Sequence, residues 1–203
     1  MKKEAFENAI KKFLPEHTSA MVTDLIFQYK IDLTITRERK TKLGDFKVNP
    51  RTGQSKISIN GNLNPWSFLI TLLHELAHAW VYADYKHRVR PHGNEWKNRY
   101  IKLMTPFFEK EIFPEDIARP LSAYMRNPKA SSSADPELVK ALRKYDKNGG
   151  EQLTVSDLEA GSIFRLNGNE FRLEQKRRTR YLCTNLKNNR QYLISGIAII
   201  EAV

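Results

Sequence analysis

The chain of 203 residues contains a single cysteine, Cys183, so it cannot close an internal disulfide or build a four-cysteine zinc site. No apolar run approaches the roughly 18 residues needed to cross a bilayer. The N-terminal residues carry no apolar signal core. Internal repeats are absent, and glycine and proline number nine each, which excludes collagen-like and low-complexity classes. We therefore expect a cytoplasmic protein, with association with the nucleoid as an option.

Positive charge is what the chain has in excess. Lys and Arg total 34 against 23 Asp and Glu, a formal net charge of +11, while 40% hydrophobic residues suffice for a packed core. Such a charge favours polyanionic partners, most often nucleic acid, through neutralisation of phosphates. The alternative is that the excess only keeps the protein in solution.

The first sixty residues predict two helices and a small sheet. Apolar residues recur at helical intervals from Phe6 to Tyr29, and Pro15 divides them into two helices. Residues 31–35 then alternate between apolar and polar, as in a half-buried strand. Further strands over 44–48 and 56–59 flank a turn, which predicts a small antiparallel sheet.

A long buried helix is predicted to begin at Asn64-Pro65, because Asn is a favoured N-cap and Pro is favoured at the first helical position. It extends to about Asp84 and is apolar nearly all round, so most of its surface must be buried. Another helix is expected to follow His92-Gly93.

The long helix carries His74-Glu75-Leu76-Ala77-His78, an HExxH motif. His74 and His78 are four residues apart and therefore share one helix face, where both imidazoles can bind one Zn²⁺ ion. Glu75 is close enough to take a proton from a water that the metal activates, which makes it the candidate general base. The motif predicts a zinc metalloendopeptidase. The alternative is a pair of buried histidines satisfied by hydrogen bonds in the core.

A catalytic zinc site needs a third protein ligand. The histidine candidates are His17, His87 and His92. Spacing favours His92, because Gly93 allows a sharp turn into the next helix, and Asp84 or Glu95 would be the fallback ligands.

Taken together, Leu72–Trp80 and Pro91–Trp96 make the chain resemble the SprT-like zinc metalloproteases, relatives of Spartan, over roughly residues 5–108. The resemblance implies an α+β, zincin-like fold with one Zn²⁺ held by His74, His78 and His92, and with Glu75 as general base. It also implies a protein substrate associated with or crosslinked to DNA, single- or double-stranded, because the Spartan branch cleaves such crosslinks.

The chain departs from the family in its last third, where SprT proteins commonly carry a four-cysteine zinc ribbon. Here Cys183 alone remains, so a second zinc is excluded. Strand patterns around an Asn167-Gly168 turn predict a small all-β module instead. We expect a metalloprotease domain over 1–125, a linker with a short helix over 126–160, and a basic β module over 161–203.

Basic residues gather in three segments. The first runs from Lys176 to Tyr181, where Lys176, Arg177, Arg178 and Arg180 adjoin an aromatic ring suited to stacking on bases. The others lie nearer the zinc motif, at residues 37–42 and 86–99. These segments predict DNA binding, and solvated loops are the alternative.

Two further features carry no predicted chemistry. Residues 146–157 imitate an EF-hand loop, but Glu151 stands at the sixth position, where the loop needs Gly. Cys183 lies on an apolar strand and is predicted to be a buried hydrophobe rather than a nucleophile.

The main alternative to a protease is a zinc-containing nucleic-acid-binding protein without protease activity.

Overall fold

The computed structural model describes residues 2–39, 41–131, 135–147, 152–178 and 180–203. By their backbone contacts the residues divide into two compact units, 1–132 and 133–203. The three-part division expected above stays a prediction. No helix among the described residues is both long and apolar enough to cross a bilayer.

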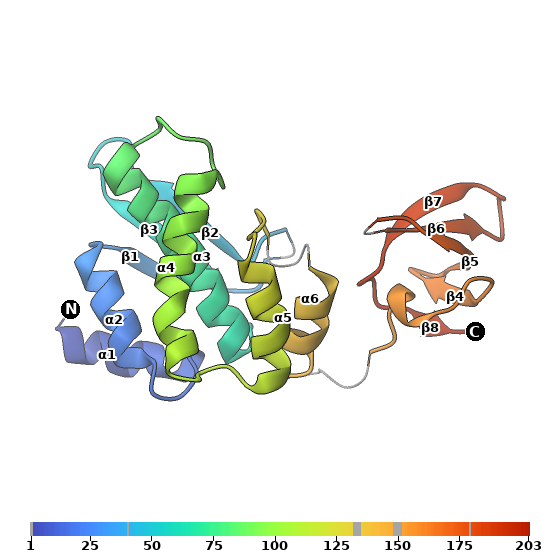
Figure 1. Cartoon of the computed structure of the whole chain (residues 1–203), viewed down its shortest axis with the longest axis horizontal. Coiled ribbons are helices and arrows are strands. Elements are labelled where there is room, and N and C mark those ends of the chain that lie inside the picture. The colour runs from blue at the N-terminus through green and yellow to red at the C-terminus, as the bar shows by residue number, and fades with distance from the viewer. Residues whose placement is uncertain (1, 40, 132–134, 148–151, 179) are drawn as a thin grey trace. The chain divides into compact units, whose positions relative to one another are not determined.

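The first unit contains five of the α-helices found in the described residues and a three-stranded sheet (Figure 1). Its elements in chain order are α1 (Lys3–Ile10), the 3-10 helix η1 (Lys11–Phe13), α2 (Ser19–Gln28), β1 (Asp32–Thr36), β2 (Gly44–Val48), β3 (Ser55–Asn60), α3 (Pro65–Tyr85), α4 (Asn94–Glu109) and α5 (Glu115–Met125). The unit is therefore mixed α+β, as the sequence predicts.

The sheet is mixed rather than antiparallel, which corrects the sequence-based prediction. β2 and β3 form the expected antiparallel hairpin, but β1 pairs with β3 in parallel and the strand order is β1-β3-β2. Alternation within a strand reports which face is buried and carries no information about the direction of its neighbour. β3 therefore lies between β1 and β2, which are not neighbours in the sheet.

α3 is the central helix of the first unit. It packs against β2 and β3 on one side and against α4 on another. The Asn64 side chain accepts a hydrogen bond from the Ser67 amide at 2.8 Å, and Pro65 occupies the first turn, so the predicted N-terminus is confirmed. Phe68, Leu72, Leu73 and Leu76 are fully buried. The helix that carries the HExxH motif is thus a rigid core element.

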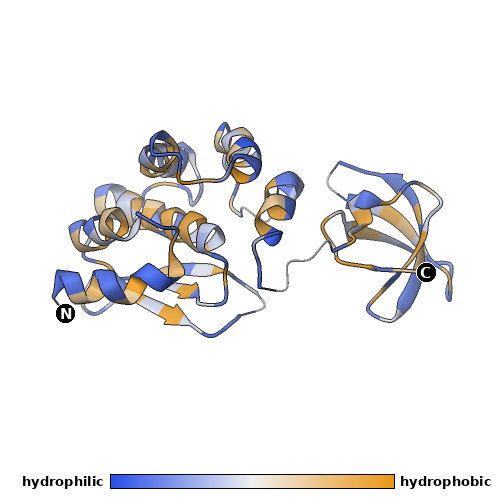
Figure 2. Cartoon of the chain, turned by 90° about the horizontal axis from the view of Figure 1, so that it is seen from below, coloured by the Kyte–Doolittle hydropathy of each residue, from blue (hydrophilic) through white to orange (hydrophobic). Residues whose placement is uncertain are grey.

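The second unit contains α6 (Pro136–Arg143), the 3-10 helix η3 (Val155–Asp157), β4 (Ile163–Leu166), β5 (Asn169–Lys176), β6 (Arg180–Asn185), β7 (Gln191–Ser195) and β8 (Glu201–Ala202). The five strands form one antiparallel sheet in the order β7-β6-β5-β4-β8. Asn167 and Gly168 both have positive φ, which confirms the predicted tight turn between β4 and β5. Apolar side chains form the core of this sheet, and Figure 2 shows hydrophobic strand segments in both units.

Cys183 is fully buried in this second core, as predicted. Burial raises the pKa of its thiol to about 11, which keeps the sulfur protonated at neutral pH. The segment that imitates an EF-hand includes residues 148–151, which lie outside the described residues.

Candidate metal centre

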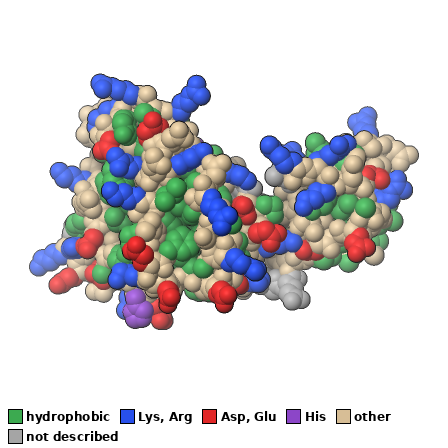
Figure 3. Space-filling model, viewed as in Figure 1, with side chains coloured by type: hydrophobic (Ala, Val, Ile, Leu, Met, Phe, Trp, Pro, Cys, Tyr) green, Lys and Arg blue, Asp and Glu red, His purple; other side chains and the backbone are tan. Residues whose placement is uncertain are grey.

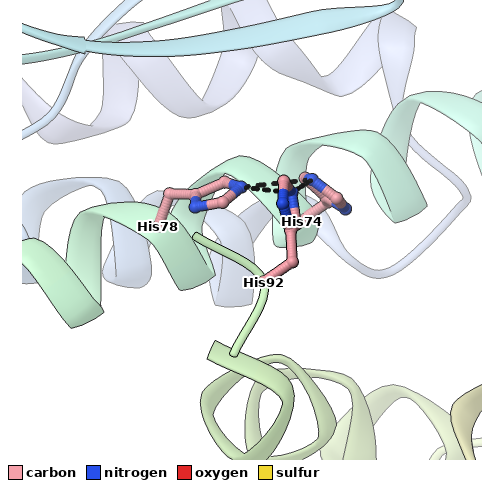
Figure 4. A group of neighbouring side chains, drawn as sticks. All are labelled: His74, His78 and His92. Atoms are coloured by element: carbon pink, nitrogen blue, oxygen red, sulfur yellow. Dashed lines mark hydrogen bonds between the residues drawn. The ribbon is translucent and has the colours of Figure 1, made fainter. Parts of the chain in front are cut away.

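Three imidazole rings converge at one point of the first unit. His74 and His78 project from α3, and His92 reaches the same point from the loop that precedes α4 (Figure 4). The Nε2 atoms lie 3.3 Å apart for His74 and His78, 3.0 Å for His78 and His92, and 3.2 Å for His74 and His92. The structure therefore brings together the three residues that the sequence analysis singled out as zinc ligands.

The loop of residues 86–93 returns the chain to α3 through two left-handed residues. Lys86 follows the last turn of α3 with φ 56°, and His92 has φ 58°. Gly93 comes next, and its amide donates to the Arg90 carbonyl at 3.0 Å. A Cβ at Gly93 would lie 3.0 Å from that same carbonyl oxygen, so a side chain there would crowd the turn. This tight turn turns the His92 ring toward α3.

The indole of Trp96 packs against all three imidazoles. Its ring centroid lies 4.6 Å from that of His74, 5.5 Å from His78 and 4.8 Å from His92. The side chain is 1% exposed, and its Nε1 donates to the His74 carbonyl at 3.3 Å. Sequence reasoning used Trp96 only as part of the Pro91–Trp96 segment that carries the family resemblance, and gave it no role at the site. Its position four residues after His92 was the signal that placed it beside the same site.

The geometry of the three nitrogens fits a single metal ion. Each Nε2 offers either one N–H or one lone pair, so among three mutually adjacent nitrogens at least two must be of the same kind and repel. Hydrogen bonds alone therefore cannot satisfy the cluster, whereas a central cation accepts three lone pairs at once. Ligands about 2.0–2.1 Å from a tetrahedral Zn²⁺ ion are separated by about 3.3–3.4 Å, close to the spacing observed.

The electrostatics favour the neutral, ligating form of these rings. Burial lowers the pKa of His74, and the neighbouring His78 and His92 rings lower it further, to about 3. Burial and the His92 ring lower the pKa of His78 to about 4, and burial lowers the pKa of His92. All three rings are therefore deprotonated near neutral pH and present lone pairs.

Glu75 has an unusual environment for a carboxylate. Its side chain is 8% exposed, and burial raises its pKa to about 7, helped by the nearby charge of Asp45. A hydrogen bond from the backbone amide of Phe46 on β2 and the charges of Arg39 and Lys42 act in the opposite direction. A carboxyl group with a pKa near neutrality both accepts and returns a proton efficiently at physiological pH.

Gly44 provides the space that the Glu75 side chain occupies. A Cβ at Gly44 would lie 2.8 Å from Glu75 Oε1 and 2.6 Å from Thr71 Cγ2. The φ of Gly44 is not positive, so the backbone there suits any residue and the requirement is one of space alone. Sequence reasoning placed Gly44 at a strand end and gave it no role, because nothing local links it to α3.

The other candidate ligands lie elsewhere. His17 is exposed, and the ring of His87 packs against Tyr82 with centroids 5.3 Å apart. Asp84 pairs with the Arg99 guanidinium at 2.8 Å. Within the described part of the chain, His74, His78 and His92 are the residues grouped closely enough to share a metal ion, and Glu95 is not in that group.

The basic segments differ in whether their cations have structural partners. Arg39 donates to Asn60 and Ser58, each at 2.8 Å, and Arg99 stacks on Trp80, so both have structural partners. At the β5–β6 hairpin, by contrast, four cations are exposed: Lys176, Arg177, Arg178 and Arg180. Figure 3 shows Lys and Arg side chains spread over the visible surface of both units.

Tyr181 does not offer the stacking surface that its sequence context suggested. Its side chain is 8% exposed and belongs to the core of the second unit. A Cβ at Gly196 would lie only 2.8 Å from its ring, which shows how closely the chain covers it. The reason is strand periodicity, since Tyr181 shares its face with the buried Cys183 two residues later. The ring is therefore unavailable to a nucleic acid base.

Comparison with known proteins agrees with the sequence resemblance. The model of the SprT-like family matches residues 16–113, a range that includes β1–β3, the HExxH helix and His92. No curated protein and no solved structure matches the chain. The segment that builds the histidine site therefore lies wholly within the region that matches the SprT-like family.

Proposed function

We propose that this chain is a zinc-dependent metalloprotease that hydrolyses peptide bonds in DNA-associated or DNA-crosslinked proteins. The observation that carries the proposal is the convergence of three neutral imidazoles beside a buried carboxyl group whose pKa is raised to about 7. A Zn²⁺ ion at this point would polarise a peptide carbonyl and activate a water molecule. His74, His78 and His92 would hold it.

Glu75 performs the proton transfers in this proposal. As the carboxylate it takes a proton from the attacking water, and as the carboxylic acid it returns that proton to the amine that leaves. A pKa near 7 suits both roles, because neither form is strongly disfavoured at neutral pH. The Phe46 amide and the space at Gly44 support the position of the carboxyl group during both steps.

β2 offers a place for an extended substrate. In the sheet order β1-β3-β2 it is an edge strand, so the side of its backbone that faces away from β3 can pair with a peptide, apart from the Phe46 amide that donates to Glu75. The same strand contributes the Phe46 amide to Glu75, and the Phe46 ring stacks on His78 with centroids 6.4 Å apart. A peptide paired with β2 therefore runs past both the general base and the histidines.

The experiment that tests the protease is a cleavage assay with Glu75→Gln, an isosteric change that removes the titratable oxygen. We expect the variant to retain zinc and to lose cleavage, because the imidazoles are untouched and the base is gone. Zinc content measured in the same samples separates loss of chemistry from loss of metal. Full activity of Glu75→Gln would refute the assigned base.

DNA association rests on different residues. The exposed cations of the β5–β6 hairpin and the net charge of +11 support contacts with phosphates. We expect the affinity for a DNA duplex or single strand to fall steeply between 50 and 200 mM salt, by about tenfold or more for several phosphate contacts. A salt-independent affinity would exclude this partner. DNA binding with zinc present but no cleavage would instead favour the non-enzymatic alternative.

A further inference from the structure

A cavity of about 690 Å³ opens beside His78 and His92. Its walls come from the second half of α3, the turn between β2 and β3, and the loop of residues 86–92. Apolar side chains line part of it, among them Val48, Val81, Tyr82 and Val89. The volume is large enough for several residues of an extended peptide next to the histidines.

Cationic side chains also line this cavity. Lys47, Lys86 and Arg90 line it together with His87, and none of the lining residues is Asp or Glu. Lys47 has a partner, since its ammonium lies 3.3 Å from Asp45. Among the described residues, no carboxylate comes within ion-pair distance of Lys86 or Arg90. The cavity therefore presents uncompensated positive charge to whatever fills it.

Lys86 is held at the cavity wall at a conformational cost. With φ 56° and ψ −127°, and with the Arg88 amide donating to the Tyr85 carbonyl at 3.2 Å, it is the second residue of a type II′ turn. That position strongly prefers Gly, and a residue with a side chain is strained there. The Lys86 ammonium lies 4.8 Å from the centroid of the Tyr82 ring, which fixes it against the apolar wall. This contact holds the Lys86 charge at the cavity wall.

We propose that this cavity binds an acidic segment of the protein substrate, so that cleavage occurs beside Asp or Glu residues. The inference rests on the proposed protease function and adds a substrate class to it. Carboxylates of the segment would meet Lys86 and Arg90, and their methylene groups would pack on Tyr82 and Val89. Two partly exposed charge pairs of this kind change affinity by about tenfold.

The test measures peptide binding, which does not require turnover. A fluorescently labelled Glu-rich peptide and its Gln and Lys counterparts are titrated with the full-length, zinc-loaded Glu75→Gln variant. We expect the Glu-rich peptide to bind about tenfold more tightly than the Gln peptide. Lys86→Gln combined with Arg90→Gln removes that preference. The matched control is Arg88→Gln, which deletes the same charge from the same loop but at a residue outside the cavity lining.

Each outcome decides the proposal. Equal binding of the Glu and Gln peptides, or loss of the preference in Arg88→Gln alone, would overturn it. A different result would assign the cavity to phosphates instead. Duplex DNA would then compete with the peptide, and the double variant would lose more affinity for the DNA than for the peptide. If the wild-type zinc protein binds the Glu-rich peptide with this preference but never cleaves it, the protease function fails while the acidic specificity stands.

Discussion

Replacing Gly44 with Ala should separate the catalytic geometry of this protein from its metal binding. The new Cβ would lie 2.8 Å from Glu75 Oε1, 3.0 Å from Glu75 Cγ and 2.6 Å from Thr71 Cγ2. Because non-bonded heavy atoms prefer separations of about 3.5–4.0 Å, the neighbours must give way by about 1 Å. Both neighbours belong to α3, which is packed on two sides, and β2 is paired to β3 through Gly44 and Ile59.

The atoms that can move most easily belong to the Glu75 side chain, which has three rotatable bonds. Its displacement separates the carboxyl group from the Phe46 amide that donates to it. Misplacement of a reacting group by about 1 Å costs roughly a hundredfold in rate, and overpacking of a core costs about 1–3 kcal/mol of stability. We therefore expect kcat of Gly44→Ala to fall about a hundredfold, with an unchanged zinc content.

The assay compares kcat, KM, zinc content and urea unfolding with those of Gly61→Ala. A Cβ at Gly61 would lie 2.8 Å from Ile35 Cγ2, so this control introduces a similar clash in the same unit without contact to the histidines or Glu75. It should lose comparable stability and keep its kcat. If the two variants lose stability alike and both retain kcat, the space at Gly44 has no role in positioning the base.

Three further predictions concern the metal centre and the second unit. His92→Ala should lower zinc occupancy measured by elemental analysis, and an unchanged occupancy would assign the third ligand to another side chain. The metal-free protein should lose stability as the pH falls from about 6.5 toward 4.5. Unfolding lets His74 and His78 take up two protons, and Glu75, whose pKa is raised in the folded state, releases one, so the free energy of unfolding falls by about 1.4 kcal/mol per pH unit or more. Urea unfolding that shows no such pH dependence would contradict the burial of the rings. Gly168→Ala should destabilise the second unit by about 1 kcal/mol in thermal unfolding because φ is +74° there, and an unchanged unfolding temperature would show that the turn tolerates a side chain.

Local patterns carried much of the fold. Caps, helical periodicity and strand alternation depend on neighbours within a few residues, so α3, the β2–β3 hairpin and the Asn167-Gly168 turn follow from the sequence. α5 was not predicted, although Ile117, Leu121 and Tyr124 recur at helical spacing and are buried. Pro120 inside the helix obscured that pattern, because proline reads as a helix breaker.

The sequence by itself determined the pairing of His74 and His78, since residues four apart on a helix must share a face. It also determined that the helix holding them is buried. Only the tertiary structure decided that His92 reaches their Nε2 atoms, that β1 runs parallel to β3, and that Gly44 makes room for Glu75. Those contacts join segments that are distant along the chain, and their geometry depends on how the loops return and how the sheet packs on α3. The physical reason is that covalent spacing constrains only near neighbours, whereas a binding site is completed by packing.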